Sequence, residues 1–407
     1  MTAFWNFKRK IGMKKKILDN FGGRQFPLAK MMKLTVSGQN RPLKLFKAKF
    51  REITRYDLRL SKNGYASMPH SIVFQPSFRC NLRCKGCTFY GESGICLSSE
   101  RNMKQSELSL SEVRDFFTEI APSVPVVIFT GGEPFIRKDT IDMIEFAKSK
   151  KMFCSVITNG TLLDEGIIRR LLKAKLDVII FSIDGVENIH DDVRGVSGTY
   201  RRVINNLELI SRLKKEMGVV YPLVQINHTI FEQNYSRISD FAEHINSLKT
   251  IHPDILSFHY PMFLSHKQAC VHRAVIKKRF GVDSDWIMGQ VISSINIDPK
   301  ILKEQKEIIM AAEKRYPFKV VFQPNLGDQA DDYFKENYEP KGKICYRTWC
   351  QPSIEPDGRV QFCSDVYIGN VKDNFKKVWN GEKARDFRLV LKKGLFPGCK
   401  RCCYLTY

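Results

Sequence analysis

Three cysteines in one short stretch are the residues of this chain best suited to chemistry. Cys80, Cys84 and Cys87 have C-x3-C-x2-C spacing and follow an apolar run at 71–74. A tight loop after a strand can gather three thiolates, which suit three irons of a [4Fe-4S] cluster whose fourth iron stays open. The alternatives are three buried cysteines or a zinc site, although zinc normally has paired C-x2-C or a nearby His.

A second motif, Gly131-Gly132-Glu133-Pro134, closes the next apolar run. Glycines let the main chain approach a ligand closely, and a carboxylate can accept a charge-assisted hydrogen bond. Together with the cysteine loop, this motif resembles the radical S-adenosylmethionine (SAM) superfamily. The resemblance implies that the open iron chelates SAM, and that the Gly-Gly-Glu-Pro backbone and carboxylate hold the ammonium group of SAM.

The same resemblance implies a reaction. Such an oxidoreductase takes a low-potential electron from flavodoxin or ferredoxin, cleaves SAM reductively to a 5′-deoxyadenosyl radical and oxidatively modifies a C-H bond. The cofactor does the difficult chemistry, while the protein positions the reactants and excludes water. A peptide or protein is the leading substrate hypothesis, and a lipid or lipid-linked sugar is the alternative. From another class, a non-catalytic iron-sulfur protein with a vestigial barrel is also considered.

Length and composition indicate a folded protein of several domains. The chain has 407 residues, 43% of them hydrophobic and 11% aromatic, which suits a large buried core. It has no uncharged apolar run of the roughly 18 residues that a membrane span needs, and its N-terminus does not resemble a signal peptide. We therefore expect a cytoplasmic protein, in which the 12 cysteines are more naturally metal ligands than disulfides.

Positive charge is concentrated at the N-terminus. The net charge is +23, and residues 1–70 hold 17 Lys and Arg against 3 Asp and Glu, which predicts an anionic partner. Aromatic residues alternate with lysines at 4–18, and apolar residues recur at helical spacing at 43–60. This pattern is compatible with peripheral contact with an anionic membrane. Nucleic acid is disfavoured because no RNA-binding motif accompanies the charge.

From residue 71 onward, apolar runs typical of strands alternate with helical patterns, which predicts parallel β/α units. The strand candidates are 72–75, 126–130, 153–157, 178–182, 224–229 and 255–258. Ser109 and Glu112 form a capping box before one helix. Six units fit the partial (β/α)6 TIM-like barrel that the resemblance implies. We assign residues 71–262 to this α/β barrel and residues 1–70 to a basic helical extension.

The remaining candidate SAM contacts follow the strand candidates, where loops at the C-terminal ends of parallel strands carry ligands. The resemblance implies that Ser182 contacts SAM and that Arg194 pairs with the SAM carboxylate, which suits a bidentate guanidinium. Asn227 is a candidate for contact with the ribose. Asp184 and His190 are interpreted as structural residues that shape the loop.

One position departs from the family pattern. Many relatives have an aromatic residue just before the third cysteine, against which adenine packs, whereas this chain has Gly86. Adenine must then pack on another residue, such as Phe89, Tyr90 or one on the fifth strand.

Residues 263–340 are assigned to a helical connecting region, with helices expected around 286–294 and 299–314. His259, His266 and His272, with Cys270 nearby, are interpreted as separate polar contacts, and a shared metal site is the alternative. Because this region leaves the barrel near its open side, it is a candidate wall of the substrate pocket.

Six further cysteines lie near the C-terminus. Asp357-Gly358 predicts a hairpin that separates two of them. Residues 341–407 resemble the SPASM/twitch extension of radical SAM enzymes, which binds auxiliary [4Fe-4S] clusters. Two clusters would need about eight thiolates, so we expect one, and zinc bound by the same thiolates is the alternative. The predicted ligands are Cys350, Cys363, Cys399 and Cys402, with Cys345 as an alternative or additional ligand.

Overall fold

A computed structural model describes residues 50–51, 54–96, 107–292, 295–363 and 366–406. The segment at 4–18 lies outside these residues, as do residues 43–49 and 52–53 of the segment at 43–60, whose described part includes α5 (Tyr56–Leu60). Within the described ranges, no helix is both long and apolar enough to cross a bilayer.

The core of the fold is a curved sheet whose central strands follow one another in chain order. Each strand pairs in parallel with the next, and the six predicted strands are confirmed. Val, Ile and Phe fill them because the strands are buried on both faces. The strands are β1 (Ser71–Phe74), β2 (Val126–Phe129), β3 (Phe153–Thr158), β4 (Val178–Ser182), β5 (Leu223–Thr229) and β6 (Ile255–His259). β7 (Lys319–Gln323) adds a seventh parallel strand that the sequence did not predict.

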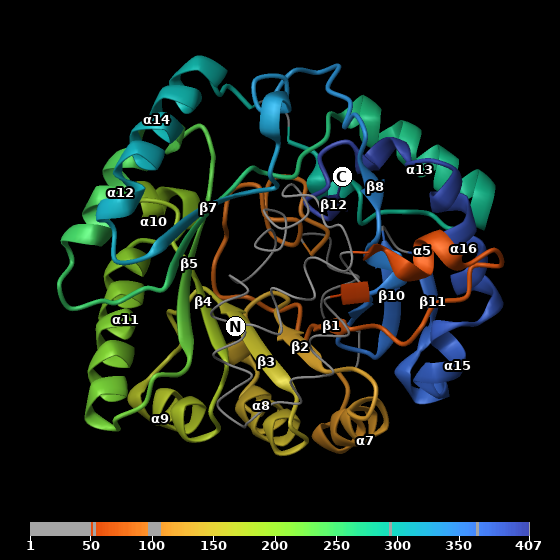
Figure 1. Cartoon of the computed structure of the whole chain (residues 1–407), viewed down its shortest axis with the longest axis horizontal. Helices are drawn as coiled ribbons and strands as arrows, with labels where there is room; N and C mark the ends of the chain where they lie inside the picture. The colour runs from red at the N-terminus through yellow and green to blue at the C-terminus, as the bar shows by residue number, and fades with distance from the viewer. Residues whose placement is uncertain (1–49, 52–53, 97–106, 293–294, 364–365, 407) are drawn as a thin grey trace, which may run out of the picture.

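Helices cover the outer face of this sheet (Figure 1). The predicted capping box is confirmed, because the side chain of Ser109 accepts a hydrogen bond from the Glu112 N–H and the Glu112 carboxylate accepts one from the Ser109 N–H. The covering helices are α7 (Leu110–Ile120), α8 (Thr140–Ser149), α9 (Glu165–Lys173), α11 (Thr199–Glu216), α12 (Ile238–Ser247) and α14 (Pro299–Ala312).

The C-terminal hairpin extends the same sheet. β9 (Ser353–Ile354) pairs in parallel with β1, and β10 (Arg359–Cys363) pairs antiparallel with β9 and with β11 (Val366–Asn370). The strand order is β11-β10-β9-β1-β2-β3-β4-β5-β6-β7, so the barrel is open. Both cysteine-bearing segments therefore start from neighbouring strands of one sheet.

The connecting region differs in part from its prediction. α13 (His266–Phe280) and α14 are helices, which confirms the helix expected at 299–314. The helix expected at 286–294 is wrong over the described residues 286–292, where only Met288–Gln290 form a short 3-10 turn. The segment pairs instead with Leu264, whose N–H donates to the Gln290 carbonyl (3.0 Å) and whose carbonyl accepts from the Ile292 N–H (3.3 Å).

Arg388 connects several parts of the C-terminal segment through buried hydrogen bonds and a cation–π contact. This residue of α16 (Glu382–Lys393) is fully buried, and its guanidinium lies 4.2 Å from the ring centroid of Trp379, the last residue of α15 (Phe375–Trp379). It donates hydrogen bonds to the carbonyl oxygens of Thr348 (2.8 Å), Gly64 (3.0 Å) and Trp379 (2.8 Å). The C-terminal helices are thereby joined to the segment that leads into β1.

Replacing Arg388 by Met should destabilise the fold, because three buried carbonyl oxygens lose their donors. We expect the free energy of unfolding to fall by roughly 3–5 kcal/mol, because each unpaired buried acceptor costs about 1–3 kcal/mol. Guanidinium denaturation measures this change. R169M is the control, since Arg169 bonds to Glu165 and Glu216 on the surface and its loss should shift the midpoint little. Equal shifts in both variants would contradict the prediction.

Candidate active site

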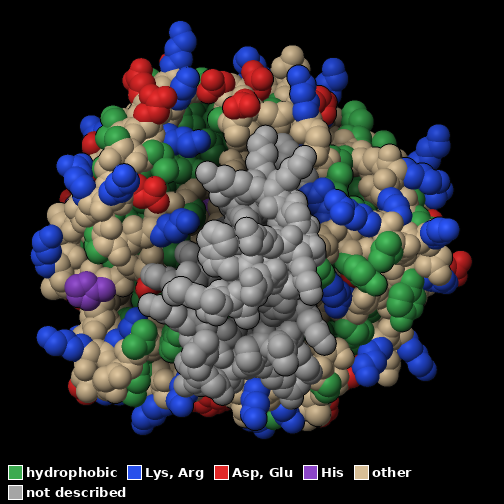
Figure 2. Space-filling view, in the orientation of Figure 1, with side chains coloured by type: hydrophobic (Ala, Val, Ile, Leu, Met, Phe, Trp, Pro, Cys, Tyr) green, Lys and Arg blue, Asp and Glu red, His purple; other side chains and the backbone are tan. Residues whose placement is uncertain are grey.

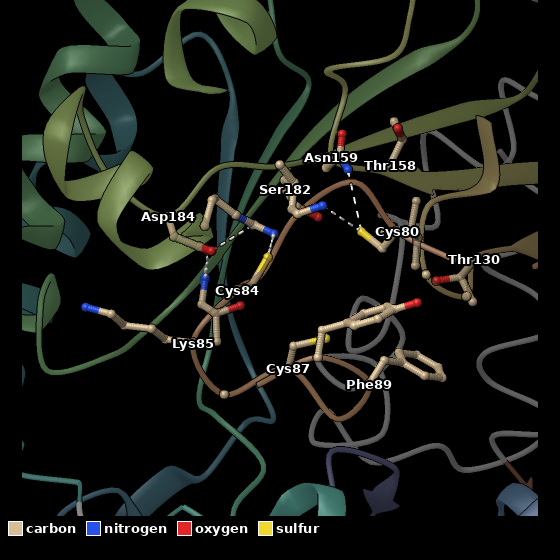
Figure 3. A pocket seen from close by; sticks show the side chains of 18 of the residues that line it. Cys80, Cys84, Lys85, Cys87, Phe89, Thr130, Thr158, Asn159, Ser182 and Asp184 are labelled. Atoms are coloured by element: carbon tan, nitrogen blue, oxygen red, sulfur yellow. Dashed lines mark hydrogen bonds and ion pairs between the residues drawn. The ribbon is translucent and has the colours of Figure 1, made fainter. Parts of the chain in front are cut away.

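The three cysteines of residues 80–87 line one cavity of about 270 Å³ (Figure 3). The cavity lies beyond the C-terminal ends of the parallel strands, where ligand-binding loops are expected. Its other walls come from segments that follow β2, β3, β4 and β5. They include Thr130, Gly131, Gly132, Asn159, Ser182, Asp184, Arg194, Thr229 and Phe231.

The cysteine loop is fixed by the end of a short helix, α10 (Asn188–Arg194). The Arg83 N–H donates to the Arg194 carbonyl (3.1 Å), and the Lys85 N–H donates to the Val193 carbonyl (2.8 Å). These backbone hydrogen bonds set the position of Cys84, which lies between them in the chain. The loop is therefore built onto α10.

The glycine motif packs against the chain that leads into Cys80. The Gly132 N–H donates to the Ser77 carbonyl (3.0 Å), and the Glu133 N–H donates to the Arg79 carbonyl (2.8 Å). A Cβ on Gly132 would lie 2.2 Å from the Arg79 carbonyl oxygen, and one on Gly131 would lie 2.5 Å from that of Ser77. Glycine is needed here because no side chain fits between the two segments.

Glu133 has an internal role in the structure. Its buried carboxylate accepts hydrogen bonds from the Thr158 hydroxyl (2.7 Å), the Asn159 N–H (2.8 Å) and the Phe135 N–H (3.2 Å). Neither Glu133 nor Pro134 lines the cavity, whereas Gly131 and Gly132 do. The carboxylate thus fastens the end of β2 to the end of β3, and its contact with the ammonium group of SAM stays a prediction.

Arg194 lies against the cysteine loop, and one of its guanidinium nitrogens has no hydrogen-bond partner. Its Nη2 pairs with Asp184 Oδ2 (2.7 Å) and its Nη1 lies 3.7 Å from Cys84 Sγ, while its Nε is buried without a hydrogen-bond partner. Asp184 Oδ1 accepts from the Thr229 N–H (2.7 Å), and the Asp184 N–H donates to His190 Nδ1 (3.1 Å). Asp184 and His190 are thus structural, as predicted.

The other two candidate SAM contacts differ in whether they line the cavity. Ser182 lines the cavity, whereas Asn227 does not, and Asn227 Oδ1 accepts a hydrogen bond from Gln225 Nε2 (2.6 Å). Sequence reasoning missed Phe231, two residues beyond β5, whose ring lies 2.8 Å from where a Cβ on Gly86 would be. Phe231 therefore lies beside position 86, where many relatives have an aromatic residue. In the sequence, the only sign of this arrangement was the glycine at position 86.

The placement of the three thiols suits a metal cluster better than a single metal ion. They line one cavity, yet within the described segments no three His, Cys, Asp or Glu side chains gather around a single metal-ion position. Burial raises the pKa of Cys80 to about 12, and burial also raises the pKa of Cys84, although Arg194 partly offsets this. Metal binding removes such protons. Three thiols on one cavity and the unpartnered Arg194 Nε fit an iron-sulfur cluster with an anionic ligand beside it.

A second group of thiols forms at the C-terminal end. β12 (Leu405–Thr406) pairs with β8 (Ile344–Cys345), which places Cys345 beside the chain that follows Cys402. Burial first, and then neighbouring thiols that include Cys363, raise the pKa of Cys399 and Cys402 well above the usual range. The structure therefore brings Cys345, Cys363, Cys399 and Cys402 near one another, with Cys403 next to Cys402.

Cys350 is placed differently from these four. Its thiol donates to the Tyr346 carbonyl (3.3 Å), and its own carbonyl accepts from the His70 N–H (3.1 Å). Its electrostatic influence is on Arg388, at the buried side of the hairpin. The predicted choice between Cys350 and Cys345, or of both, as cluster ligands stays a prediction.

The histidines near residue 266 do not form a common site. His259 Nε2 lies 2.9 Å from Ser257 Oγ, and His266 Nδ1 lies 3.6 Å from Cys270 Sγ. His272 Nδ1 accepts from the Gly398 N–H (3.1 Å). They are separate polar contacts, as predicted.

Comparison with protein families agrees with this geometry. The sequence model of the radical SAM superfamily matches residues 74–245, and that of the SPASM iron-sulfur cluster-binding domain matches residues 345–403. Residues 74–245 thus match a radical SAM domain, and residues 345–403 match a SPASM domain. Radical SAM domains bind a [4Fe-4S] cluster and SAM, and SPASM domains bind auxiliary iron-sulfur clusters.

Two relatives are similar to part of the chain. The chain is 28% identical over 177 residues to an AdoMet-dependent heme synthase of Methanosarcina barkeri (43% of this chain, 46% of the relative). It is 29% identical over 196 residues to a PqqA peptide cyclase of Granulibacter bethesdensis (47% of this chain, 48% of the relative). The chain thus spans less than half of either relative.

A solved structure shows the same fold over a longer range. SuiB of Streptococcus suis, bound to S-adenosylmethionine, superposes with a TM-score of 0.57 and 16% identity, covering 88% of this chain and 77% of SuiB. This likeness includes both the open parallel sheet and the C-terminal extension.

The role of Glu133 can be tested in protein prepared without SAM. E133A leaves three donors without an acceptor, and because each unpaired buried donor costs about 1–3 kcal/mol, the free energy of unfolding should fall by about 2–4 kcal/mol. Guanidinium denaturation measures the change, with the exposed E165A as control. Unchanged stability in E133A would show that the carboxylate serves the ligand and not the fold.

Glu133 should also make stability depend on pH in iron-free protein. Burial raises its pKa from 4.5 to about 7, so in this window the folded state holds a proton that the unfolded state has lost. The free energy of unfolding should therefore fall as pH rises from about 4.5 to about 7. Denaturation at a series of pH values should show that the free energy of unfolding falls less steeply with pH in E133A than in wild type. Identical slopes would exclude Glu133 as the titrating group.

Proposed function

We propose that this chain is an oxidoreductase that uses SAM and a [4Fe-4S] cluster to modify a C-H bond of a peptide or protein. The observation that carries the proposal is the single cavity that Cys80, Cys84 and Cys87 line together with the glycine turn and Arg194. When bound, the reduced cluster and SAM supply radical chemistry that removes a hydrogen atom from an unactivated carbon.

The residues of the cavity have separate tasks in this proposal. The three thiolates hold the cluster, and Arg194, oriented by Asp184, offers its free Nε to the SAM carboxylate. Thr130 and the two glycines present their backbone to the ammonium group. In place of the residues named from the sequence for the missing aromatic, Phe231 is the platform we favour for adenine, because it borders Gly86 inside the cavity.

We further propose one auxiliary cluster held by Cys345, Cys363, Cys399 and Cys402. Support comes from the grouping of these thiols and from the match of the SPASM model, which begins at residue 345. A cluster with four thiolates has no open iron for substrate, so its natural role is to accept an electron from the substrate. Cys350 would then be a structural thiol.

A peptide substrate is supported by the peptide cyclase relative, while the heme synthase relative shows that the alignment alone does not fix the substrate. The lipid alternative and membrane contact depend mainly on the basic residues 1–49, outside the described ranges, and stay predictions. On the face shown in Figure 2, Lys and Arg side chains are scattered among acidic ones and form no single basic patch around the described barrel.

Anaerobic reconstitution tests the reaction. Protein loaded with iron and sulfide and given dithionite and SAM should release 5′-deoxyadenosine, measured by liquid chromatography and mass spectrometry. C84A should reduce this release to background because one cluster ligand is lost. C270A, which removes an exposed cysteine, is the matched control and should resemble wild type.

The substrate is tested in the same reaction with peptides encoded beside the gene. A peptide that loses two hydrogen atoms in the presence of SAM supports the proposal. Modification of a porphyrin instead would change the substrate class and leave the SAM chemistry intact. Zinc in place of iron at residues 80–87, or unchanged SAM cleavage in C84A, would overturn the proposed function itself.

A further inference from the structure

Residues 286–292 lie between the two cysteine loops and contact both. The segment follows α13, turns at Met288–Gln290, and is fixed at its far end by two backbone hydrogen bonds to Leu264. It supplies no candidate ligand to either site, so the proposed function gives it no role.

One side of this segment packs on the first cysteine loop. A Cβ on Gly289 would lie 2.5 Å from the carbonyl oxygen of Thr88, the residue after Cys87. The Trp286 ring packs edge-on against Phe89, with centroids 5.1 Å apart, and against Phe78 at 6.1 Å. Phe89 itself lines the SAM-site cavity (Figure 3).

The other side packs on the C-terminal cysteine loop. A Cβ on Gly398 would lie 2.8 Å from Ile287 Cδ1 and 2.9 Å from the ring of His272. The Gly398 N–H also donates to His272 Nδ1 (3.1 Å), which anchors the residue just before Cys399 to α13. Ile287 is buried, with 2% of its surface exposed.

Two glycines thus make close contacts on opposite sides of one short turn. Gly289 has no side chain whose rotation could absorb a movement of Thr88. Gly398 likewise has none that could absorb a movement of Ile287. Packed interiors transmit such displacements because they contain few voids. A shift of the first loop therefore has to move residues 286–292, and that movement reaches the chain around Cys399.

We propose that residues 286–292 position the two cysteine loops against each other, so that SAM binding at residues 80–90 changes the stability of residues 397–403. Gly289 is the positioning residue on the first side, and Ile287 is its counterpart on the second. The proposal rests on the proposed function, because SAM is the ligand that starts the effect.

Hydrogen exchange of the full, cluster-loaded chain, followed by mass spectrometry with and without SAM, measures this coupling. The reporters are the amides of Cys399 and Cys402, whose N–H groups donate to the carbonyls of Phe396 (2.9 Å) and Cys399 (3.1 Å). SAM should slow exchange at residues 80–90, at 286–292 and at 397–403. At the two reporter amides we expect about a fivefold effect, the lower end of typical coupling between sites.

G289A is the decisive variant, because its methyl group must push Thr88 away. The SAM effect should persist at residues 80–90 and fall below about twofold at 397–403. G394A is the matched control, since a Cβ there meets nothing within 4 Å, and it should behave as wild type. If G289A does not fold, Trp286→Leu, which removes the ring contacts with Phe78 and Phe89, should give the same loss.

The outcomes separate this inference from the proposed function. Wild-type protein that responds to SAM at residues 80–90 but not at 397–403 overturns the inference alone. So does a variant, G289A or W286L, in which the reporter amides respond as in wild type. Absence of any SAM response at residues 80–90 in iron-loaded wild type instead contradicts the proposed function.

Discussion

The buried ion pair of Arg194 and Asp184 is the interaction on which the site depends. Asp184 follows β4 and also accepts a hydrogen bond from the end of β5, so its carboxylate has a fixed place in the sheet. Arg194 ends α10, whose last carbonyls receive the N–H groups of the cysteine loop. Removing one partner of such a buried pair typically costs about 3–5 kcal/mol. Here it would also free the loop that carries Cys84.

The same pair explains why Arg194 stays charged beside the cysteine thiols before an anionic ligand binds. Burial opposes the charged form of Arg194, and the neighbouring carboxylate and thiol more than offset this, so the pKa of Arg194 lies above its usual value. The guanidinium therefore stays charged while only part of its donor set is used. This is preorganisation, because the cation is already oriented before a ligand arrives.

One sheet carries both groups of cysteines. β1 leads into Cys80, and its neighbour β9 begins the hairpin at whose far end Cys363 lies. The β8–β12 pair returns the end of the chain to the same region. Arg401, between Cys399 and Cys402, donates to the Tyr333 carbonyl (2.7 Å) and stacks on Phe263 at 4.1 Å from the ring centroid. The connecting region therefore supports the second cysteine loop as well as the first.

The sequence by itself determined six parallel strands, the two cysteine groups and the resemblance to radical SAM and SPASM domains, because apolar runs, capping residues and thiol spacing are local patterns. It also identified Gly86 as a departure. Only the tertiary structure decided what depends on distant residues: that Glu133 turns inward to Thr158, that Phe231 fills the space beside Gly86, and that Cys345 lies beside the chain that follows Cys402. Residues 286–292 read as a helix in isolation, yet their backbone pairs with Leu264, because packing between two loops outweighs a weak local preference.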